Sequence, residues 1–344
     1  MPFGKPIILV DVSNTVYRAH FAHRHLMHEG HSTGSYHGFL QTVLSLRQVS
    51  PRMVFCWDYG IPTDAPLTGR PRCWRHAVFP DYKATRKATP DHAIVRRQMP
   101  NIYRLLTWLG YSSVGIPGLE ADDVISCIAH EIVTRFKPLS QTLIYSSDRD
   151  LYQILPNADA LARCRVVEQA IGAPVRDSIQ ILQPGKKDGK YRRITSADVE
   201  KQFGVTVDQW PAYLALGGDS SDNIKPARGM GPKTAVKLIE AGARPDRPFW
   251  DQYVSFRQDH NKLKPVWPRV QAAYRVALLP GSWRDPRICT YTDGVGPIYH
   301  PERRWVHNSQ RLEGLRQFMK FCAQHGLLQM LAKRREFFQK ESEV

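Results

Sequence analysis

Residues 6–12 read PIILVDV, an uninterrupted apolar run that carries Asp11 near its end. Such a run is typical of a strand in a parallel sheet, because helices cover both faces of that sheet and every side chain is buried. Two further runs, RMVFCWDYG at 52–60 and QTLIYSSDRD at 141–150, also end in acids, namely Asp58, Asp148 and Asp150. The carboxyl ends of parallel strands share one edge, so we expect these aspartates to gather where α/β sheets bind ligands.

Helical patterns separate the strands. They are GFLQTVLSLRQV at 38–49, HAIVRRQMPNIYRLLTWLG at 92–110 and ADDVISCIAHEIVTRF at 121–136. Alternating strands and helices predict an α/β fold with a mostly parallel sheet. Residues 177–195 read as two short strands joined by a hairpin turn at Asp188-Gly189. From about Thr195 the chain becomes mainly helical, with Ser196 expected to cap the first helix.

The chain has 344 residues, which favours about two domains, and its formal net charge of +16 favours polyanionic partners, either nucleic acid or an anionic membrane surface. The first apolar run is too short for a signal peptide or a membrane span, so we expect a cytosolic protein that does not enter membranes. Six scattered cysteines without a Cys-x-x-Cys pair argue against a disulfide framework and a zinc ribbon.

The segment GLEADDVISC, residues 118–127, places three acids at a helix start: Glu120, Asp122 and Asp123. Acids in a first turn commonly bind the unpaired backbone N–H groups, so an ordinary helix start explains this segment when it is taken alone. The other acids favour a metal site. Asp148 and Asp150 share a face if their segment is extended, and GGDSSDN adds Asp219 and Asp222. Carboxylates gathered at one edge repel each other unless cations offset them, and oxygen ligands suit Mg²⁺ or Mn²⁺.

Six motifs in this order resemble those of the 5′-nuclease family, which includes the 5′→3′ exonuclease domain of bacterial DNA polymerase I and the flap endonucleases of bacteria and bacteriophages. They are ILVDVSNTVYRA, FCWDYG, FPDYKATRKATP, GLEADDVI, YSSDRDLYQIL and GGDSSDNIKPARGMGPKTAVKLI. The similarity covers roughly residues 7–240, and the stand-alone form is the one implied. It implies a PIN-like α/β nuclease domain over 1–183, with a helical arch near 75–98. Residues 184–344 would form a helical duplex-DNA-binding domain with a helix-hairpin-helix-type motif.

The resemblance implies two-metal phosphodiester hydrolysis with two Mg²⁺ or Mn²⁺ ions in one active site. The implied metal ligands are Asp11, Asp58, Glu120, Asp122, Asp148, Asp150, Asp219 and Asp222, with Asp123 a ligand or a partner of the ligands. Lys83 and Arg86 would contact the scissile phosphate, and Arg18 another phosphate. The implied DNA-binding residues are Tyr17, Tyr82, Gly229, Gly231, Lys233 and Thr234. Without the resemblance, Tyr17 reads equally well as a core aromatic and the 75–87 segment as a solvated basic face.

Two positions depart from the family pattern. Val12 stands where the family usually has glycine after the first aspartate. Lys225-Pro226 replaces the usual Pro-Gly in the 223–231 loop, where the family often binds K⁺, so that ion is left open. The segment HFAHRHLMHEGH also invites a zinc hypothesis through its histidines, His20, His23, His25, His28 and His31. No cysteines complete a tetrahedral set, so a solvated, DNA-facing loop is favoured.

We therefore predict a structure-specific 5′ nuclease that acts as a 5′→3′ exonuclease and flap endonuclease in primer or flap removal during replication. The expected partner is DNA with a 5′ flap, a 5′ end or a branch, with an RNA-DNA primer as a further candidate. We expect a monomer in the cytoplasm of a bacterial or phage-infected cell. The alternatives are a catalytically silent branched-DNA-binding protein and a metal-dependent ribonuclease. A haloacid dehalogenase-type phosphatase is disfavoured, because it needs an aspartate at position 13, which is Ser13.

Overall fold

The computed structural model describes residues 5–62, 72–136, 141–157, 179–185, 191–226, 229–247, 263–292, 294, 296–297 and 308–338. The chain divides into two compact units, each built from separate segments. The first unit comprises Met1–Pro71, Ala88–Ser147 and Ser282–Val344, and the second comprises Arg72–Lys87 and Asp148–Gly281. The expected division into domains 1–183 and 184–344 stays a prediction, and the segment 75–98 expected to form the arch contributes residues to both units.

Four parallel strands form the centre of the first unit, in the spatial order β5-β4-β1-β6. Their bounds are β1 Ile7–Asp11, β4 Met53–Trp57, β5 Ser112–Gly115 and β6 Thr142–Tyr145. Every residue of β1, β4 and β6 is buried, as the continuous apolar runs predict. The register pairs Asp11 with Cys56, so β1 and β4 end at the same edge.

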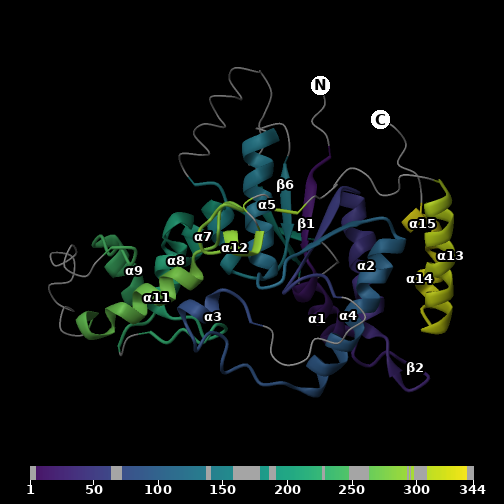
Figure 1. Ribbon diagram of the computed structural model, residues 1–344, viewed down its shortest axis with the longest axis horizontal. Helices are drawn as coiled ribbons and strands as arrows, with labels where there is room; N and C mark the ends of the chain where they lie inside the picture. Colours follow the sequence, from purple (N-terminus) through teal and green to yellow (C-terminus); the bar gives the residue numbers. More distant parts are fainter. Residues whose placement is uncertain are drawn as a thin grey trace. The chain divides into compact units, whose positions relative to one another are not determined.

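Helices cover both faces of these strands. They are α1 Val12–His23, α2 Gly34–Val49, α4 Pro90–Trp108 and α5 Ala121–Phe136. Figure 1 shows α5 on one side of β1 and β6, with α2 and α4 on the other. Right-handed crossovers require this arrangement, because the chain moves from β1 outward to β5 and then returns past β1 to reach β6. The helices expected over 38–49, 92–110 and 121–136 are confirmed.

The other described elements of the first unit are a short hairpin and a group of C-terminal helices. The hairpin pairs β2 Met27–His28 with β3 His31–Ser32. The helices are α12 Cys289–Thr292, α13 Asn308–Gln324, α14 Leu328–Ala332 and α15 Arg334–Phe338, of which α13 packs on α4 and α14 on α2. No helix in the described part of the chain is both long enough and apolar enough to cross a membrane.

The expectation of a solvated histidine loop is wrong for its first members. His20 and His23 lie on α1, and His20 is buried. His20 Nε2 lies 2.8 Å from a carboxylate oxygen of Asp91, and its Nδ1 lies 3.3 Å from the Ser35 hydroxyl. The helix continues to His23 because Val12, Val16 and Ala19 repeat at helical spacing and bury one face, which places His20 inside.

The described residues of the second unit are mainly helical, apart from an antiparallel pair formed by β7 Ile179–Pro184 and β8 Tyr191–Ile194. Its helices are α3 Arg75–Val78, α7 Ser196–Phe203, α8 Trp210–Gly217, α9 Pro232–Glu240 and α11 Trp267–Ala277, with the 3-10 helices η2 Asp150–Ile154, η3 Val207–Gln209 and η5 Lys264–Val266. Helix α8 packs against α9 and α11, and the fully buried Trp210 and Trp267 lie on α8 and α11. The two predicted strands are confirmed, whereas their turn at Asp188-Gly189 lies outside the described residues.

The cap of α7 differs from the prediction by one residue. Thr195, not Ser196, precedes the helix, and its side chain accepts a hydrogen bond from the backbone N–H of Asp198. The Asp198 carboxylate in turn accepts bonds from the backbone N–H and the hydroxyl of Thr195, which lower the pKa of Asp198. This reciprocal pair satisfies two backbone N–H donors at the helix start. A cap at Ser196 would lie only two residues before Asp198, and the pairing requires three.

Candidate metal centre

Asp11 ends β1 and also caps α1, so two backbone elements fix its carboxylate. Its Oδ1 accepts a hydrogen bond of 3.0 Å from the backbone N–H of Asn14. Its Oδ2 accepts one of 2.9 Å from the hydroxyl of Ser146, which follows β6. Asp11 is 7 % exposed. The adjacent position, Val12, is buried and is the first residue of α1.

Asp58 follows β4 and shares its surroundings with Asp11. Its Oδ1 accepts a 2.8 Å hydrogen bond from the backbone N–H of Ala121, the first residue of α5. Burial, followed by the negative charges of Asp11 and Asp58, raises the pKa of the Cys56 thiol well above its usual value. The negative charges of both carboxylates therefore affect the same buried thiol, near the edge where β1 and β4 end.

The acids at the start of α5 include one that stabilises the helix itself. Asp123 is fully buried, and its Oδ2 accepts a 3.0 Å bond from the backbone N–H of Glu120. Asp122 Oδ1 accepts a 2.7 Å bond from the backbone N–H of Asp123. The side chain of Glu120 instead accepts a 2.5 Å hydrogen bond from the hydroxyl of Tyr59. The ordinary helix-start explanation thus describes Asp123 well, whereas the Glu120 carboxylate bonds to a side chain from the loop after β4.

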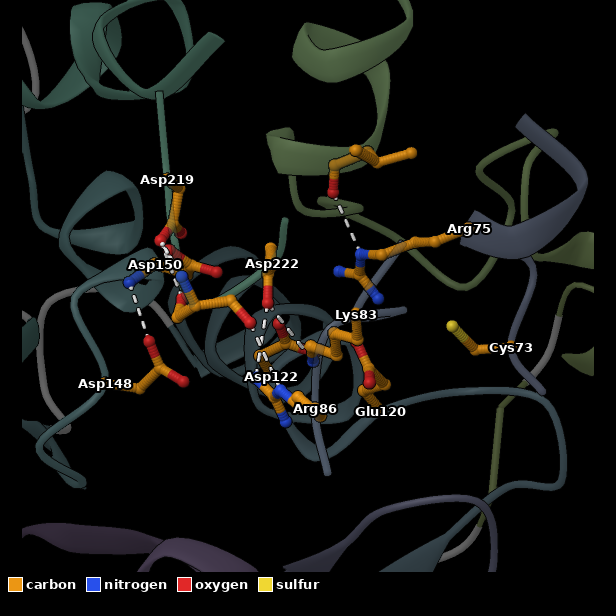
Figure 2. Close-up of polar contacts among 12 residues, drawn as sticks. Cys73, Arg75, Lys83, Arg86, Glu120, Asp122, Asp148, Asp150, Asp219 and Asp222 are labelled. Carbon is orange, nitrogen blue, oxygen red and sulfur yellow. Dashed lines mark hydrogen bonds and ion pairs between the residues drawn. The ribbon is translucent and has the colours of Figure 1, made fainter. Parts of the chain in front are cut away.

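Three acids of the second unit form a group with the spacing of metal ligands. One carboxylate oxygen from each of Asp150, Asp219 and Asp222 lies within 4.8 Å of the other two. Figure 2 shows Asp150 and Asp219 side by side, with Asp222 between this pair and the side chains of Lys83 and Arg86. Asp222 is 4 % exposed, so its charge is largely removed from water. Like charges this close repel strongly at reduced dielectric, and hard oxygen ligands suit Mg²⁺ or Mn²⁺, so the donor set fits a divalent cation.

Asp148 differs from its predicted geometry. The segment is not extended at Asp150, which begins the 3-10 helix η2. Asp148 Oδ1 accepts a 3.0 Å bond from the backbone N–H of Asp150 and thereby shapes the turn before η2. The premise that the two side chains share one face of a strand is therefore wrong, because the chain turns into a helix at once.

The loop that carries Asp219 and Asp222 is closed on itself. Asp219 and Ile224 exchange two backbone hydrogen bonds of 2.8 and 2.7 Å. Asp219 Oδ1 accepts bonds from the backbone N–H and the hydroxyl of Ser221. Gly218 precedes the loop with φ +85°, and a Cβ there would lie 2.5 Å from Cδ of Pro226. The proline that departs from the family pattern is therefore packed against a position that only glycine can occupy.

The basic turn, residues 81–86, is bound to this loop by its backbone and its side chains. The backbone N–H of Lys83 donates to the Asp222 carbonyl at 3.1 Å, and Asn223 Nδ2 donates to the Asp81 carbonyl at 2.8 Å. Lys83 Nζ and an Arg86 guanidinium nitrogen lie 3.7 and 3.3 Å from Asp222 Oδ1. The Lys83 side chain is 18 % exposed and that of Arg86 is 56 % exposed. Two cations are thus held at one of the grouped carboxylates (Figure 2).

The ring of Tyr82 supports Lys83 and is itself buried. Lys83 Nζ lies 4.7 Å from the centre of this ring, a favourable cation–π distance. Tyr82 is 2 % exposed, and its predicted contact with DNA stays a prediction. Its position beside Lys83 indicates that it helps to orient the ammonium group.

Arg75, the first residue of α3, anchors the segment that leads into the basic turn. It is 1 % exposed, lies 4.7 Å from the centre of the Trp74 ring, and donates a 2.9 Å hydrogen bond from Nε to the carbonyl of Val276. Val276 lies in the last turn of α11, where carbonyls have no partner within the helix. The amide of Gln153 binds the next carbonyl, that of Ala277, at 2.9 Å.

Replacing Arg75 with methionine should lower the free energy of unfolding by about 2 kcal/mol, because the buried Val276 carbonyl loses its donor. The change is measured as a lower midpoint of urea or thermal unfolding. The control is Arg72→Met, which removes the same charge from an exposed position and should leave the midpoint unchanged. Equal midpoints for Arg75→Met and the wild type would contradict the anchoring role.

Two further predicted site residues, Tyr17 and Arg18, lie on α1. In the first unit, Tyr17 is half-buried and packs edge-on against His92, with ring centres 5.3 Å apart. Arg18 donates a hydrogen bond to the hydroxyl of Tyr145 and lies 5.3 Å from the centre of that ring. Both residues therefore have partners within the protein, and their predicted DNA contacts stay predictions.

Two glycines of the predicted DNA-binding set, Gly229 and Gly231, directly precede α9. A Cβ placed on Gly229 or Gly231 would meet no atom of the described residues within 4 Å. Lys233 is exposed on the first turn of α9, and Thr234 follows it. A backbone can approach another molecule closely at such glycines, and the helix start offers N–H groups to an anion. The role of this loop in DNA binding stays a prediction.

Three residues that contribute to this geometry are not predicted from the sequence. Ser146, Tyr59 and Asn223 donate hydrogen bonds to Asp11, Glu120 and the Asp81 carbonyl, respectively. Tyr59 and Asn223 directly follow predicted ligands, which is a weak signal, whereas Ser146 only follows the strand β6.

Comparison with known proteins agrees with the predicted family. Residues 6–204 match the family described as "5′-3′ exonuclease, N-terminal resolvase-like domain". The 5′-3′ exonuclease of Aquifex aeolicus is 31% identical over 239 residues, which cover 69% of this chain and 69% of that protein. The DNA polymerase I of Deinococcus radiodurans is 31% identical over 236 residues, 68% of this chain and 20% of the polymerase. The chain spans between 20% and 32% of the length of the polymerases it matches.

Solved structures share the fold at low sequence identity. The zinc-bound T5 5′-exonuclease superposes with a TM-score of 0.55 at 13% identity, covering 92% of this chain and 98% of the T5 protein. The catalytic core of Rad2, solved with a DNA substrate, superposes with a TM-score of 0.53 at 15% identity, covering 98% of this chain and 93% of that core. The predicted fold class, a mostly parallel α/β sheet with a helical C-terminal region, is confirmed. From the family match over residues 6–204, the chain belongs to the 5′-3′ exonuclease family.

Proposed function

We propose that this protein is a divalent-metal-dependent, structure-specific 5′ nuclease that hydrolyses DNA phosphodiester bonds at 5′ ends and 5′ flaps. The observation that carries the proposal is the group of Asp150, Asp219 and Asp222, whose oxygens approach within 4.8 Å beside the cations of Lys83 and Arg86. Membership of the 5′-3′ exonuclease family supports the choice of substrate.

Eight carboxylates would hold the metal ions: those of Asp11, Asp58, Glu120, Asp122, Asp148, Asp150, Asp219 and Asp222. Asp123 would position the start of α5 rather than bind an ion directly. Divalent ions bound there would activate water for attack on phosphorus and offset the charge on the leaving oxygen. Mg²⁺ is the proposed ion, with Mn²⁺ as a substitute, because all the donors are oxygen atoms. We propose that two divalent ions bind in the active site. Binding of a K⁺ in the 223–231 loop is a further part of the proposal.

Lys83 and Arg86 would bind the scissile phosphate. Both cations already lie beside Asp222, one of the grouped aspartates. Their side chains would therefore need to move little to contact a phosphate bound next to these aspartates. Preorganised cations stabilise the negative charge that develops on phosphate oxygens in the transition state. Arg18 would contact a second phosphate, and Tyr17 would stack on an unpaired base.

Duplex DNA would bind along the helical region through Gly229, Gly231, Lys233 and Thr234. Contacts of this kind involve phosphates, so binding should be insensitive to base sequence and should weaken steeply with salt. We further propose action as a monomer in the cytoplasm, in primer or flap removal during replication, with RNA-DNA primers among its substrates. The net charge of +16 is consistent with a polyanionic partner.

The test uses the purified full chain with three 5′-labelled substrates: a 5′ flap, a nicked duplex and an RNA hairpin. We expect cleavage of the flap and the nicked duplex in Mg²⁺, loss of cleavage in excess EDTA, and recovery when Mg²⁺ is restored. DNA binding without cleavage would instead indicate the silent branched-DNA binder. Cleavage of the hairpin alone would indicate a ribonuclease, and mapping products on a double flap would give the balance of exonuclease and endonuclease activities.

A further inference from the structure

Tyr59 has a backbone conformation that is rare for its residue type. It follows Asp58 with φ +59°, in the left-handed region, and Gly60 follows it with φ +101°. Glycine adopts such angles freely, whereas a bulky residue does so only where its surroundings hold it there. Residues held in this way cluster at functional sites, so the reason for a tyrosine here must lie in its contacts.

Those contacts join the end of β4 to the entry of α5. The backbone N–H of Tyr59 donates a 2.7 Å hydrogen bond to the carbonyl of Leu119. Asp58 Oδ1 accepts a 2.8 Å bond from the N–H of Ala121, two residues later. Between these two attachments, the Tyr59 hydroxyl donates its 2.5 Å hydrogen bond to Oε1 of Glu120. The left-handed turn is thus what carries the hydroxyl to this carboxylate.

The Glu120 carboxylate needs such a partner. Glu120 is 3 % exposed, and a buried charge without hydrogen bonds is strongly unfavourable. A hydroxyl bonded to a carboxylate at this distance is a short, charge-assisted hydrogen bond, which restricts the rotation of the carboxylate. One such bond uses one of the roughly four lone-pair directions of a carboxylate, so the group can still ligate a cation.

We infer that Tyr59 is a positioning residue, whose hydroxyl orients the Glu120 carboxylate for a divalent ion. The inference rests on the proposed function, because it assumes that Glu120 is a metal ligand. Groups that hydrogen-bond to ligating side chains commonly change metal affinity by about 10- to 100-fold when they are removed. A purely structural role would instead change stability and leave metal affinity as it is.

The test compares Mn²⁺ binding to the wild type and to Tyr59→Phe, in the absence of DNA, by calorimetry or by the paramagnetic resonance signal of free Mn²⁺. Tyr59→Phe keeps the ring and the backbone angle and removes only the hydroxyl. We expect a loss of Mn²⁺ affinity of about tenfold or more. Cleavage of a 5′ flap should fall at low Mg²⁺ and recover at high Mg²⁺, as a change in the Mg²⁺ requirement rather than in the maximal rate.

Two further variants make the result specific. Tyr36→Phe removes another tyrosine hydroxyl of the same unit, one that accepts a 2.9 Å bond from Asn101, and should leave Mn²⁺ affinity unchanged. Tyr59→Gly relieves the left-handed strain, so it should fold even if Tyr59→Phe does not, and it should show a similar loss of Mn²⁺ affinity. Wild-type affinity in either Tyr59 variant would overturn the inference. A wild type that binds Mn²⁺ but cleaves no substrate would refute the nuclease function alone.

Discussion

Replacing Asp150 with asparagine should lower the rate of 5′-flap cleavage by about 10³-fold or more, while affinity for the flap changes little. Asparagine keeps the size of the side chain but removes the charge and one of the oxygens of the three-aspartate group. Metal ions contribute several kcal/mol to the stabilisation of transition-state charge, and each 1.4 kcal/mol is worth a factor of ten in rate. The measurement is single-turnover cleavage in Mg²⁺, with flap affinity measured by fluorescence anisotropy in Ca²⁺.

A matched control is Asp208→Asn. Asp208 is an exposed acid on η3 of the same unit, and its carboxylate accepts a bond from Asn157. It lies outside the three-aspartate group, so its replacement should leave the cleavage rate within about twofold of the wild type. If Asp150→Asn cleaves as fast as Asp208→Asn, the grouped aspartates are not the metal centre and the proposed mechanism fails.

Replacing Lys83 with alanine should reduce the maximal cleavage rate by about 10²- to 10³-fold and change flap affinity much less. The ammonium group lies 3.7 Å from Asp222 and 4.7 Å from the centre of the Tyr82 ring, so it is held before substrate arrives. A cation fixed in this way acts mainly on the charge that develops in the transition state. Its removal therefore lowers the turnover number rather than the affinity. Steady-state kinetics on a labelled flap separate these two quantities.

Two variants control for position and for backbone. Lys87→Ala removes an exposed cation from the same segment and should leave turnover close to that of the wild type. Lys83→Gly tests the backbone, because Lys83 has φ +53° and glycine tolerates that angle without strain. Both Lys83 variants should lose activity to the same degree. Equal losses of turnover and affinity in Lys83→Ala would indicate simple phosphate anchoring.

Local patterns in the sequence predict much of the first unit. The apolar runs around 6–12, 52–60 and 141–150 predict buried parallel strands, and β1, β4 and β6 are those strands. The helix expected over 121–136 has the bounds of α5, because its acids and its apolar stripe both mark it within a few residues. The prediction fails directly after β6. The extended geometry predicted for Asp148 and Asp150 is not found, because the chain begins the 3-10 helix η2 at Asp150.

The sequence by itself determined the α/β class, the family and the identity of the acidic residues, because strand and helix periodicity and ordered motifs are properties of neighbouring residues. Tertiary structure alone decided how those acids and the segments beside them are held. Tyr59 reaches Glu120, Lys83 reaches Asp222 and Arg75 reaches Val276 across 61, 139 and 201 positions of the chain, respectively (120 − 59, 222 − 83 and 276 − 75). Contacts at such separations depend on how whole elements pack, and hydrophobic periodicity determines which face of an element is buried but not which side chain it meets.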